Sequence, residues 1–363
     1  MCIVYMNKYY KVSEAAELLD ISAETLRRWD NSGKFRSTRH PINNYRVYSE
    51  NQLLSLAKEF NLKEFDLFDT VLYDQNRLLE PIFRTDLGQL YNMDAIEFMR
   101  TIPSNSVQLV FADPPYNIKK AEWDTFESQK IYVEWSMEWI REAHRILTQD
   151  GSLFICGFSE ILADLKWACS SLFKGCKWLV WYYRNKGNLG KDWGRSHESI
   201  LHLRKGSNFI LNMDEVRIPY NAHTTRYPNR TQGASSQFSN GKEKKPEWSP
   251  NPLGAKAKDV FEIPTISNGS WEKMAHPTQK PVELMRKIIL GSSNQGSLIY
   301  DPFGGSGSTY AVAEAYGRQW IGTEFSLEYC NLIAGRIQDK EHIERIRSRK
   351  DEISSAKLRG KLR

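Results

Sequence analysis

Long apolar stretches are absent from the 363 residues of this sequence. A helix that spans a bilayer needs about 20 consecutive, mostly apolar residues, and no run approaches that length. The N-terminus also lacks the charged and then apolar pattern of a secretory signal. The sequence therefore predicts a cytoplasmic protein with no membrane partner.

Cysteine and histidine are scarce as well. The five cysteines form no Cys-x-x-Cys pair, and the seven histidines are not clustered. A disulfide framework and a metal site would both require such groupings. We expect buried free thiols and no bound metal.

The chain does carry a mild excess of positive charge and many tryptophans. Its net charge is +6, and it has eleven tryptophans. A basic balance suits a nucleic-acid partner, and indole rings can stack on bases, although core packing is their ordinary role. Single cores tend to stop growing near ~250–300 residues, so the length predicts more than one unit.

Residues 1–60 have the pattern of a small separate module. The segment VSEAAELLD predicts one helix, and AETLRRWDNSG predicts a second that carries Arg27 and Arg28. A basic loop with Arg39 and a short strand with Arg46 follow. Two helices, a tight turn and a basic wing are typical of helix-turn-helix DNA readers. The stretch resembles the MerR/excisionase family; the alternative is a helical cap that serves oligomerisation.

After a linker at 61–85, strands and helices alternate over 86–338, which predicts an α/β sheet domain. The strand candidates are QLVFAD, GSLFICG, KWLVWYYRN, SILHLRKG, GSLIYDPF and RQWIGTEF; the helix candidates are YVEWSMEWIREAHRIL, EILADLKWACSSLF, PVELMRKIILGSS and GSTYAVAEAYG. Residues 206–270 interrupt this alternation with a polar stretch. Residues 339–363 form a basic tail, which we expect to be a solvated helix or a frayed end.

A glycine-rich turn, LIYDPFGGSGST, follows one predicted strand. The strand ends at Asp301, the glycines allow close backbone approach to a ligand, and a helix then begins. The turn lacks the lysine of a phosphate-binding P-loop and the Gly-x-Gly-x-x-Gly spacing of a dinucleotide site. The next strand ends at Glu324, where an acid can hold ribose hydroxyls. S-adenosylmethionine fits such a site, with Asp301 holding its ammonium group.

The segment VQLVFADPPYNI ends another apolar strand abruptly at Asp113. Pro114 and Pro115 restrict the backbone and can hold a carbonyl outward as an acceptor. Asp113 supplies a second acceptor, and Tyr116 supplies a flat stacking face. Two acceptors beside a ring would grip an exocyclic base amine and favour a tetrahedral nitrogen whose lone pair can attack a methyl group.

Four segments together resemble the DNA amino-methyltransferases, and they cover nearly all of 86–338. DPPY and DPFGGSGST resemble the catalytic and cofactor motifs, AHPTQKPVELMRKII resembles the segment before the cofactor loop, and WYYRNKGNLGKDWGRSHESILHLRKG resembles the stretch after the catalytic motif. The catalytic motif comes first, which is the circularly permuted order of the β class. The resemblance implies a Rossmann-like, S-adenosylmethionine-dependent methyltransferase fold. Ser308-Thr309 departs mildly from the family's usual Thr-Thr.

The resemblance also implies roles for individual residues. The catalytic set is Asp113, Pro114, Pro115 and Tyr116. The cofactor set is Asp94, Asp113, Thr278, Lys280, Asp301, Phe303, Gly305, Ser306, Gly307 and Glu324. The DNA contacts are Arg27, Arg28, Arg39, Arg46 and Trp123, together with a target-recognition region at about 206–270.

The predicted activity is methyl transfer from S-adenosylmethionine to N6 of an adenine flipped out of double-stranded DNA. Asp at the first motif position favours adenine, because N4-cytosine members more often carry Ser there. Two alternatives stay open: an N4-cytosine enzyme, and a DNA-binding regulator with an inactive methyltransferase fold. The family is bacterial or phage in origin, and its members suggest a cognate restriction endonuclease and a homodimer as further partners.

Overall fold

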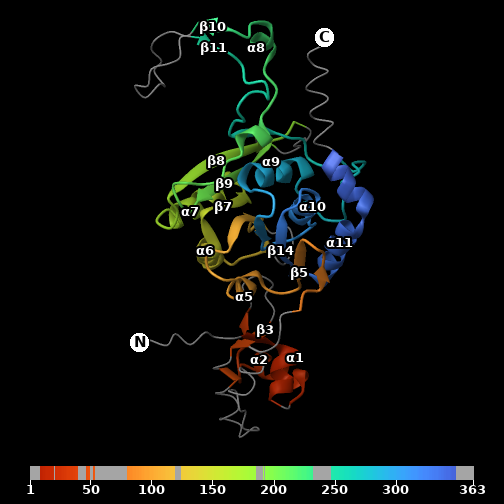
Figure 1. The fold of residues 1–363 in the computed structure, drawn as a ribbon. Coiled ribbons are helices and arrows are strands. Elements are labelled where there is room, and N and C mark those ends of the chain that lie inside the picture. The colour runs from red at the N-terminus through yellow and green to blue at the C-terminus, as the bar shows by residue number, and fades with distance from the viewer. Residues whose placement is uncertain are drawn as a thin grey trace. The chain divides into compact units, whose positions relative to one another are not determined.

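The computed structural model describes residues 9–19, 21–39, 46–49, 52–53, 80–118, 124–184, 191, 193–231 and 247–348 (Figure 1). Trp123, a predicted DNA contact, lies outside these residues. The chain divides into two compact units, of which the first comprises 1–80 and 115–134. The second comprises 81–114 and 135–363. The predicted boundaries of module, linker and catalytic domain stay predictions.

In the first unit, two short helices pack on a three-stranded sheet. The elements are β1 (Tyr9–Lys11), α1 (Val12–Leu18), α2 (Ala23–Asn31), β2 (Thr38–Arg39) and β3 (Arg46–Ser49), with strand order β1-β3-β2. Helix α2 begins where Ser22 Oγ accepts the backbone N–H of Thr25 at 3.1 Å. Leu26 and Tyr48 are fully buried in the core between helices and sheet. The predicted pair of helices with a basic wing is present.

Segment 115–134 belongs to the same unit and has its own hydrogen bonds. The buried carboxylate of Asp124 accepts the backbone N–H groups of Tyr116 at 2.5 Å and Ile118 at 3.2 Å. Asn117 adopts a left-handed backbone (φ 56°), and its side chain accepts the N–H of Phe126 at 2.9 Å. The backbone beyond the two prolines is therefore held in a defined turn.

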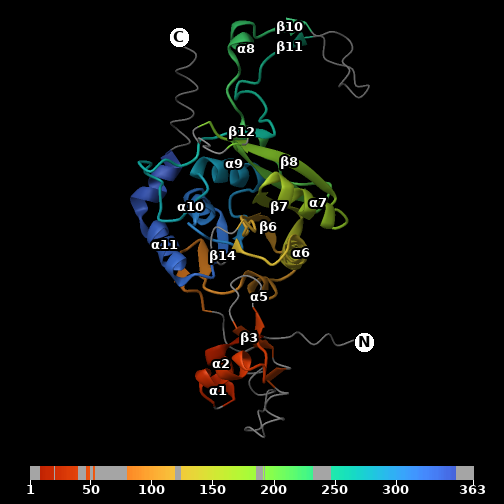
Figure 2. The same cartoon turned by 180° about the vertical axis from the view of Figure 1, so that it is seen from behind.

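The second unit is built on a nine-stranded sheet of order β12-β8-β9-β7-β6-β13-β14-β5-β4, seen from both sides in Figures 1 and 2. Strands β7, β6, β13, β14 and β5 run parallel to one another, whereas β9 is antiparallel to both β7 and β8, and β4 is antiparallel to β5. The strands are β4 (Phe83–Arg84), β5 (Gly88–Tyr91), β6 (Val107–Ala112), β7 (Leu147–Gly157), β8 (Gly175–Tyr182), β9 (His197–Arg204), β12 (Val260–Glu262), β13 (Leu298–Asp301) and β14 (Gln319–Thr323).

Helices cover this sheet and complete its core. They are α5 (Ala95–Met99), α6 (Gln129–Ile146), α7 (Ser159–Ala168), α9 (Val282–Ser292), α10 (Ser308–Ala315) and α11 (Leu327–Gln338). Helix α10 packs on α9 and on strand β14. Trp139, Tyr300, Tyr310 and Trp320 are among the largest fully buried side chains. All six predicted strands and four predicted helices are confirmed, with ends shifted by a few residues.

The chain visits the sheet in permuted order. Strand β6, which leads to Asp113, precedes β13, which leads to the glycine turn, and β13 lies between β6 and β14. The predicted Rossmann-like α/β fold is confirmed, with β6 ahead of β13 in the chain as the permuted order requires. We call the side of the sheet at which β6, β13 and β14 end the carboxyl edge, where ligand sites of such sheets form.

Two expectations need correction or completion. Residues 340–348 are helical, as one of the two expectations for the tail has it, but His342, Ile343 and Ile346 are buried, so one face of this helix is packed and only the other is solvated. Apolar side chains at helical spacing, among basic residues, explain the packing.

The polar region at 206–270 contains the 3-10 helix η2 (Met213–Val216), α8 (Ala222–Arg226), and the antiparallel pair β10 (Arg230–Thr231) and β11 (Glu247–Trp248). Within the described ranges, no helix is both long and apolar enough to cross a membrane.

Candidate methyl-transfer site

Three acidic side chains meet at the carboxyl edge because each follows or ends a parallel strand. Asp113 follows β6, Asp301 ends β13 and Glu324 follows β14. Parallel strands place their ends at the same edge, so adjacent strands bring these side chains together. Carboxylates gathered in this way favour a cationic ligand.

Asp301 is the most deeply buried of the three. Its Oδ2 accepts the hydroxyl of Thr309 at 2.5 Å, and its Oδ1 accepts the N–H of Phe303 at 3.0 Å. Burial raises the pKa of Asp301 from 3.8 to about 7, against the lowering effect of these two hydrogen bonds. A buried carboxyl whose charge is held at such cost fits a positively charged partner.

The glycine turn leads directly into α10. Gly305 and Gly307 have positive φ angles of 51° and 72°, a backbone conformation that other residues rarely adopt. Glu324 holds the turn, because its Oε2 accepts the N–H of Gly305 at 2.8 Å and its Oε1 accepts that of Ser326 at 2.8 Å. Burial raises the pKa of Glu324 as well. Each Glu324 oxygen retains a lone pair that can face a ligand hydroxyl.

A buried arginine also holds the glycine turn through hydrogen bonds. Arg336, on α11, donates to the backbone oxygen of Ser306 at 2.9 Å and to Ser308 Oγ at 3.0 Å. Ser308 Oγ in turn donates to the carbonyl of Lys280 at 2.7 Å. This arrangement joins the glycine turn to the segment before α9. Sequence reasoning missed Arg336, since an arginine on an amphipathic helix ordinarily faces solvent.

Aromatic rings surround Phe303 at the start of the turn. Its ring centroid lies 5.9 Å from Trp135 and 5.5 Å from Trp139, the latter in an edge-on arrangement. Both tryptophans lie on α6, four residues apart on one helix face. Phe303 is therefore fixed in orientation at the start of the glycine turn.

Lys280 links Asp113 to a second acid. Its ammonium lies 2.6 Å from Asp113 Oδ2 and 3.6 Å from Glu198 Oε2. Burial alone would lower the pKa of Lys280, but the two carboxylates outweigh it and the pKa is raised. Lys280 therefore stays protonated and cannot act as a base. Glu198 was also missed from the sequence, because only the antiparallel direction of β9 brings its first residues to this edge.

The remaining predicted residues have varied surroundings. Thr278 donates its N–H to His276 Nδ1 at 3.3 Å, and its carbonyl lies 3.5 Å from the Lys280 ammonium. Asp94 caps α5 by accepting the N–H groups of Ile96 and Glu97 at 2.8 and 3.0 Å. Its predicted adenine contact stays a prediction.

The predicted DNA contacts of the first unit also differ from one another. Arg27 and Arg28 are exposed on α2, although Arg27 is 3.4 Å from Glu24. Arg46 is engaged internally, with its guanidinium paired with Asp30 and also bonded to Asn31. Arg39 pairs through its backbone with Arg46 in the sheet. Arg27 and Arg28 are therefore the two arginines of this set with described, solvent-facing side chains.

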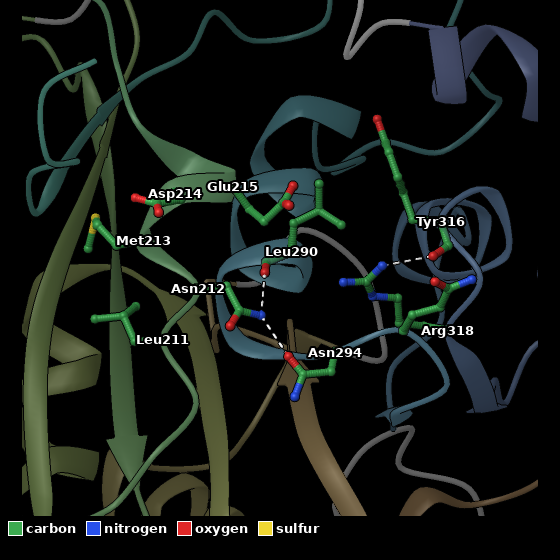
Figure 3. A pocket seen from close by; sticks show the side chains of 10 residues that line it. Leu211, Asn212, Met213, Asp214, Glu215, Leu290, Asn294, Tyr316 and Arg318 are labelled. Atoms are coloured by element: carbon green, nitrogen blue, oxygen red, sulfur yellow. Dashed lines mark hydrogen bonds between the residues drawn. The ribbon is translucent and has the colours of Figure 1, made fainter. Parts of the chain in front are cut away.

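A separate pocket of about 720 Å³ lies near the edge of the sheet at which β13 and β14 begin, opposite the carboxyl edge (Figure 3). Its walls come from the η2 segment, the end of α9 and the residues before β14, including Asn212, Glu215 and Arg318. Asn212 donates to the carbonyls of Leu290 and Ser293, and Arg318 donates to the carbonyls of Ser293 and Tyr316. These polar groups brace the loops before β13 and β14, away from the acids of the carboxyl edge.

The fold and the site define the class of protein. A permuted Rossmann-like sheet, a glycine turn between two strand-end acids and an Asp-Pro-Pro-Tyr segment after the catalytic strand are the components of an S-adenosylmethionine-dependent methyltransferase. The chain belongs to the N6/N4 DNA methylase family, whose model matches residues 107–335, and a MerR family regulatory protein model matches 11–48. It is thus an S-adenosylmethionine-dependent DNA methyltransferase with a MerR-like N-terminal module.

Known relatives match about two thirds to three quarters of this chain. The type II methyltransferase M1.MboII of Moraxella bovis is 33% identical over 260 residues, which is 68% of this chain and 95% of the relative. The DNA adenine methyltransferase YhdJ of Escherichia coli (strain K12) is 33% identical over 266 residues, covering 72% and 86%. The solved PvuII DNA methyltransferase, cytosine-N4-specific, has 20% identity and a TM-score of 0.55 over 75% of this chain and 95% of that one.

The residues at the carboxyl edge fit this cofactor. Burial disfavours the charged forms of Asp301 and Glu324, so a positively charged ligand beside them would stabilise these acids. S-adenosylmethionine supplies such charge, because it carries a sulfonium and an ammonium. The positive φ angles of Gly305 and Gly307 leave the backbone open to close approach. Among the described residues, no group of three or more acids, histidines and cysteines is arranged to hold a metal ion.

Proposed function

We propose that the protein methylates N6 of adenine in double-stranded DNA. Asp113 carries this proposal, because it is an ionisable acceptor at the first position of the Asp-Pro-Pro-Tyr segment, directly after β6. The 33% identity to a relative named as a DNA adenine methyltransferase supports the same base. The cytosine-N4 specificity named for the PvuII enzyme belongs to a neighbour of similar fold and only 20% identity.

In this proposal, Asp113 and the Pro114 carbonyl accept the two N–H groups of the target amine, and Tyr116 stacks on the flipped base. S-adenosylmethionine, when bound, supplies a methyl group on a positively charged sulfur. The amine lone pair forms the new C–N bond as the C–S bond breaks. The methylated nitrogen then carries the positive charge and loses one proton to solvent water. Lys280, paired with Asp113 and already protonated, takes no part in proton removal.

We assign cofactor contacts to Asp113, Lys280 and Thr278 at one end and to the turn residues Asp301, Phe303, Gly305, Ser306, Gly307 and Glu324 at the other. Arg27 and Arg28 are the DNA contacts we favour in the first unit, since both side chains are exposed. Residues 206–270 would read the target sequence. A cytoplasmic location, a cognate endonuclease and a homodimer complete the proposal as family expectations.

Mass spectrometry of nucleosides tests the proposal. DNA is incubated with the full chain and S-adenosylmethionine, digested and analysed, with Asp113→Ala as the matched control. N6-methyladenine from the wild type and none from the variant is the expected result. N4-methylcytosine would move the activity to the other amine, and an unmodified product would leave a DNA-binding protein without transfer. Methylation by Asp113→Ala would refute the role of Asp113.

A further inference from the structure

Glu198 lies beside the end of β6, and it falls within the family-like stretch at 181–206 without belonging to the catalytic, cofactor or DNA-contact sets given above. It is the second residue of β9, which runs antiparallel to β7, so the start of β9 lies where β6 and β7 end. Its side chain is only 15% exposed. The surroundings of Glu198 are therefore those of the carboxyl edge.

The sheet separates Glu198 from Asp113 by one intervening strand. Strand β7 lies between β6 and β9, and neighbouring strands are about 4.8 Å apart, so the two backbones are roughly 10 Å apart. The two carboxylates nevertheless converge on one buried ammonium, 2.6 Å and 3.6 Å from Lys280 Nζ. Lys280, from the segment just before α9, makes this connection and is itself only 6% exposed.

The shorter of the two contacts opposes the proposed chemistry of Asp113. An acceptor carboxylate paired at 2.6 Å with an ammonium has less negative charge available for the N–H groups of a target amine. A lysine ammonium has three donors and rotates freely, so a shift of about 1 Å moves it from one carboxylate to the other. The Glu198 carboxylate lies within that reach, so it competes with Asp113 for the Lys280 ammonium and weakens the Lys280–Asp113 pair.

We propose that Glu198 is a positioning residue that draws the Lys280 ammonium away from Asp113 when the target amine binds. Asp113 then accepts from the amine as a full carboxylate, while Lys280 remains paired and buried. The inference rests on the proposed role of Asp113 as the amine acceptor. Loss of the Glu198 charge would leave Asp113 as the stronger of the two acceptors for Lys280, and a weakened charge-assisted hydrogen bond from the target amine corresponds to about a 10- to 100-fold loss of rate.

Two substitutions separate charge from shape at this position. Glu198→Gln keeps the size and removes the charge, whereas Glu198→Asp keeps the charge on a shorter side chain. Glu142→Gln is the matched control, because Glu142 is also partly buried and pairs with Arg145 at 2.8 Å near the end of α6, just before β7 begins and outside all the proposed contact sets. The full chain is used, and single-turnover methylation is measured at saturating DNA and cofactor. Cofactor affinity by calorimetry and thermal unfolding are measured alongside.

We expect Glu198→Gln to lose about 10-fold or more in the single-turnover rate, with cofactor affinity within about 3-fold of the wild type. Glu198→Asp and Glu142→Gln should stay within about 3-fold of the wild-type rate. A wild-type rate for Glu198→Gln, or equal losses for the Gln and Asp variants, would overturn the inference. Methylation by Asp113→Ala would instead overturn the proposed function, so the two failures are distinguishable.

Discussion

Substitution of Asp301 by Asn should make the protein more stable at alkaline pH while it loses cofactor binding. Asp301 is 2% exposed and is the acid at the end of β13 whose pKa burial raises from 3.8 to about 7. Asn has nearly the same shape and can still accept the Phe303 N–H. The Thr309 hydroxyl can reverse from donor to acceptor. The substitution therefore removes a charge with little loss of packing.

The magnitude follows from the difference between the two pKa values. Between pH 3.8 and about 7, the folded protein retains a proton on Asp301 that the unfolded chain has released. The free energy of unfolding therefore falls as pH rises through this window and stays low above it. The difference between the folded and unfolded pKa values of Asp301 corresponds to about 4 kcal/mol of stability in total, of which about 2 kcal/mol is lost above pH 5.5.

Urea unfolding, followed by tryptophan fluorescence, measures this effect at about pH 5.5 and about pH 8.5. The stability of Asp301→Asn relative to the wild type should increase by about 2 kcal/mol between the two conditions. Cofactor at about 100 times its Kd should stabilise the wild type by about 2.7 kcal/mol and the variant by much less. Stability and binding would thus change in opposite directions at one residue.

Asp259→Asn is the matched control for the pH dependence. Asp259 is exposed, and its ion pair with Lys177 at 2.8 Å lowers its pKa, so it is ionised in both states at both conditions. Its substitution should produce a constant offset in stability. If Asp301→Asn also produced only a constant offset, Asp301 would titrate normally and its proposed match to a cation would be refuted.

Three further predictions test the turn, the module and the catalytic acid. Gly305→Ala should weaken cofactor binding by about 10-fold, because the turn needs a positive φ at this residue and an added Cβ would lie 3.2 Å from His276. The control variant Gly269→Ala, which has open space around the added Cβ, should bind the cofactor normally. Equal calorimetric affinities would contradict this. A double variant in which both Arg27 and Arg28 are changed to Ser should bind DNA more weakly and with less salt dependence, and its cofactor affinity should not change. Unchanged DNA binding in anisotropy titrations would assign the module to another role. Asp113→Ala should abolish methylation and spare cofactor binding, as single-turnover assays and calorimetry can check.

The strand-end acids could be predicted from the sequence because each follows a recognisable apolar run. Asp301 and Glu324 follow successive runs, so their meeting required only that the strands be parallel neighbours. The position of Asp113 beside them needed the order β6-β13-β14, which the family resemblance implied and the sheet confirms. Local pattern and family order together were sufficient for this part of the site.

The residues that were missed depend on long-range geometry. Glu198 reaches the carboxyl edge only because β9 reverses direction, and no local signal marks a strand as antiparallel. Arg336 lies 30 residues after the serine whose carbonyl it binds, on a helix whose basic residues ordinarily face solvent. Strands β4 and β5 were missed because they are two and four residues long. Such contacts arise from packing between distant segments, which local propensity does not encode.

Single-molecule sequencing of DNA from cells that express the protein tests the central claim most directly. It reports which base is modified and in which sequence context. The account predicts N6-methyladenine at a defined recognition sequence, with no such mark in cells that express Asp113→Ala. Modification confined to cytosine, or DNA without any modified base in cells that contain the folded protein, would contradict it.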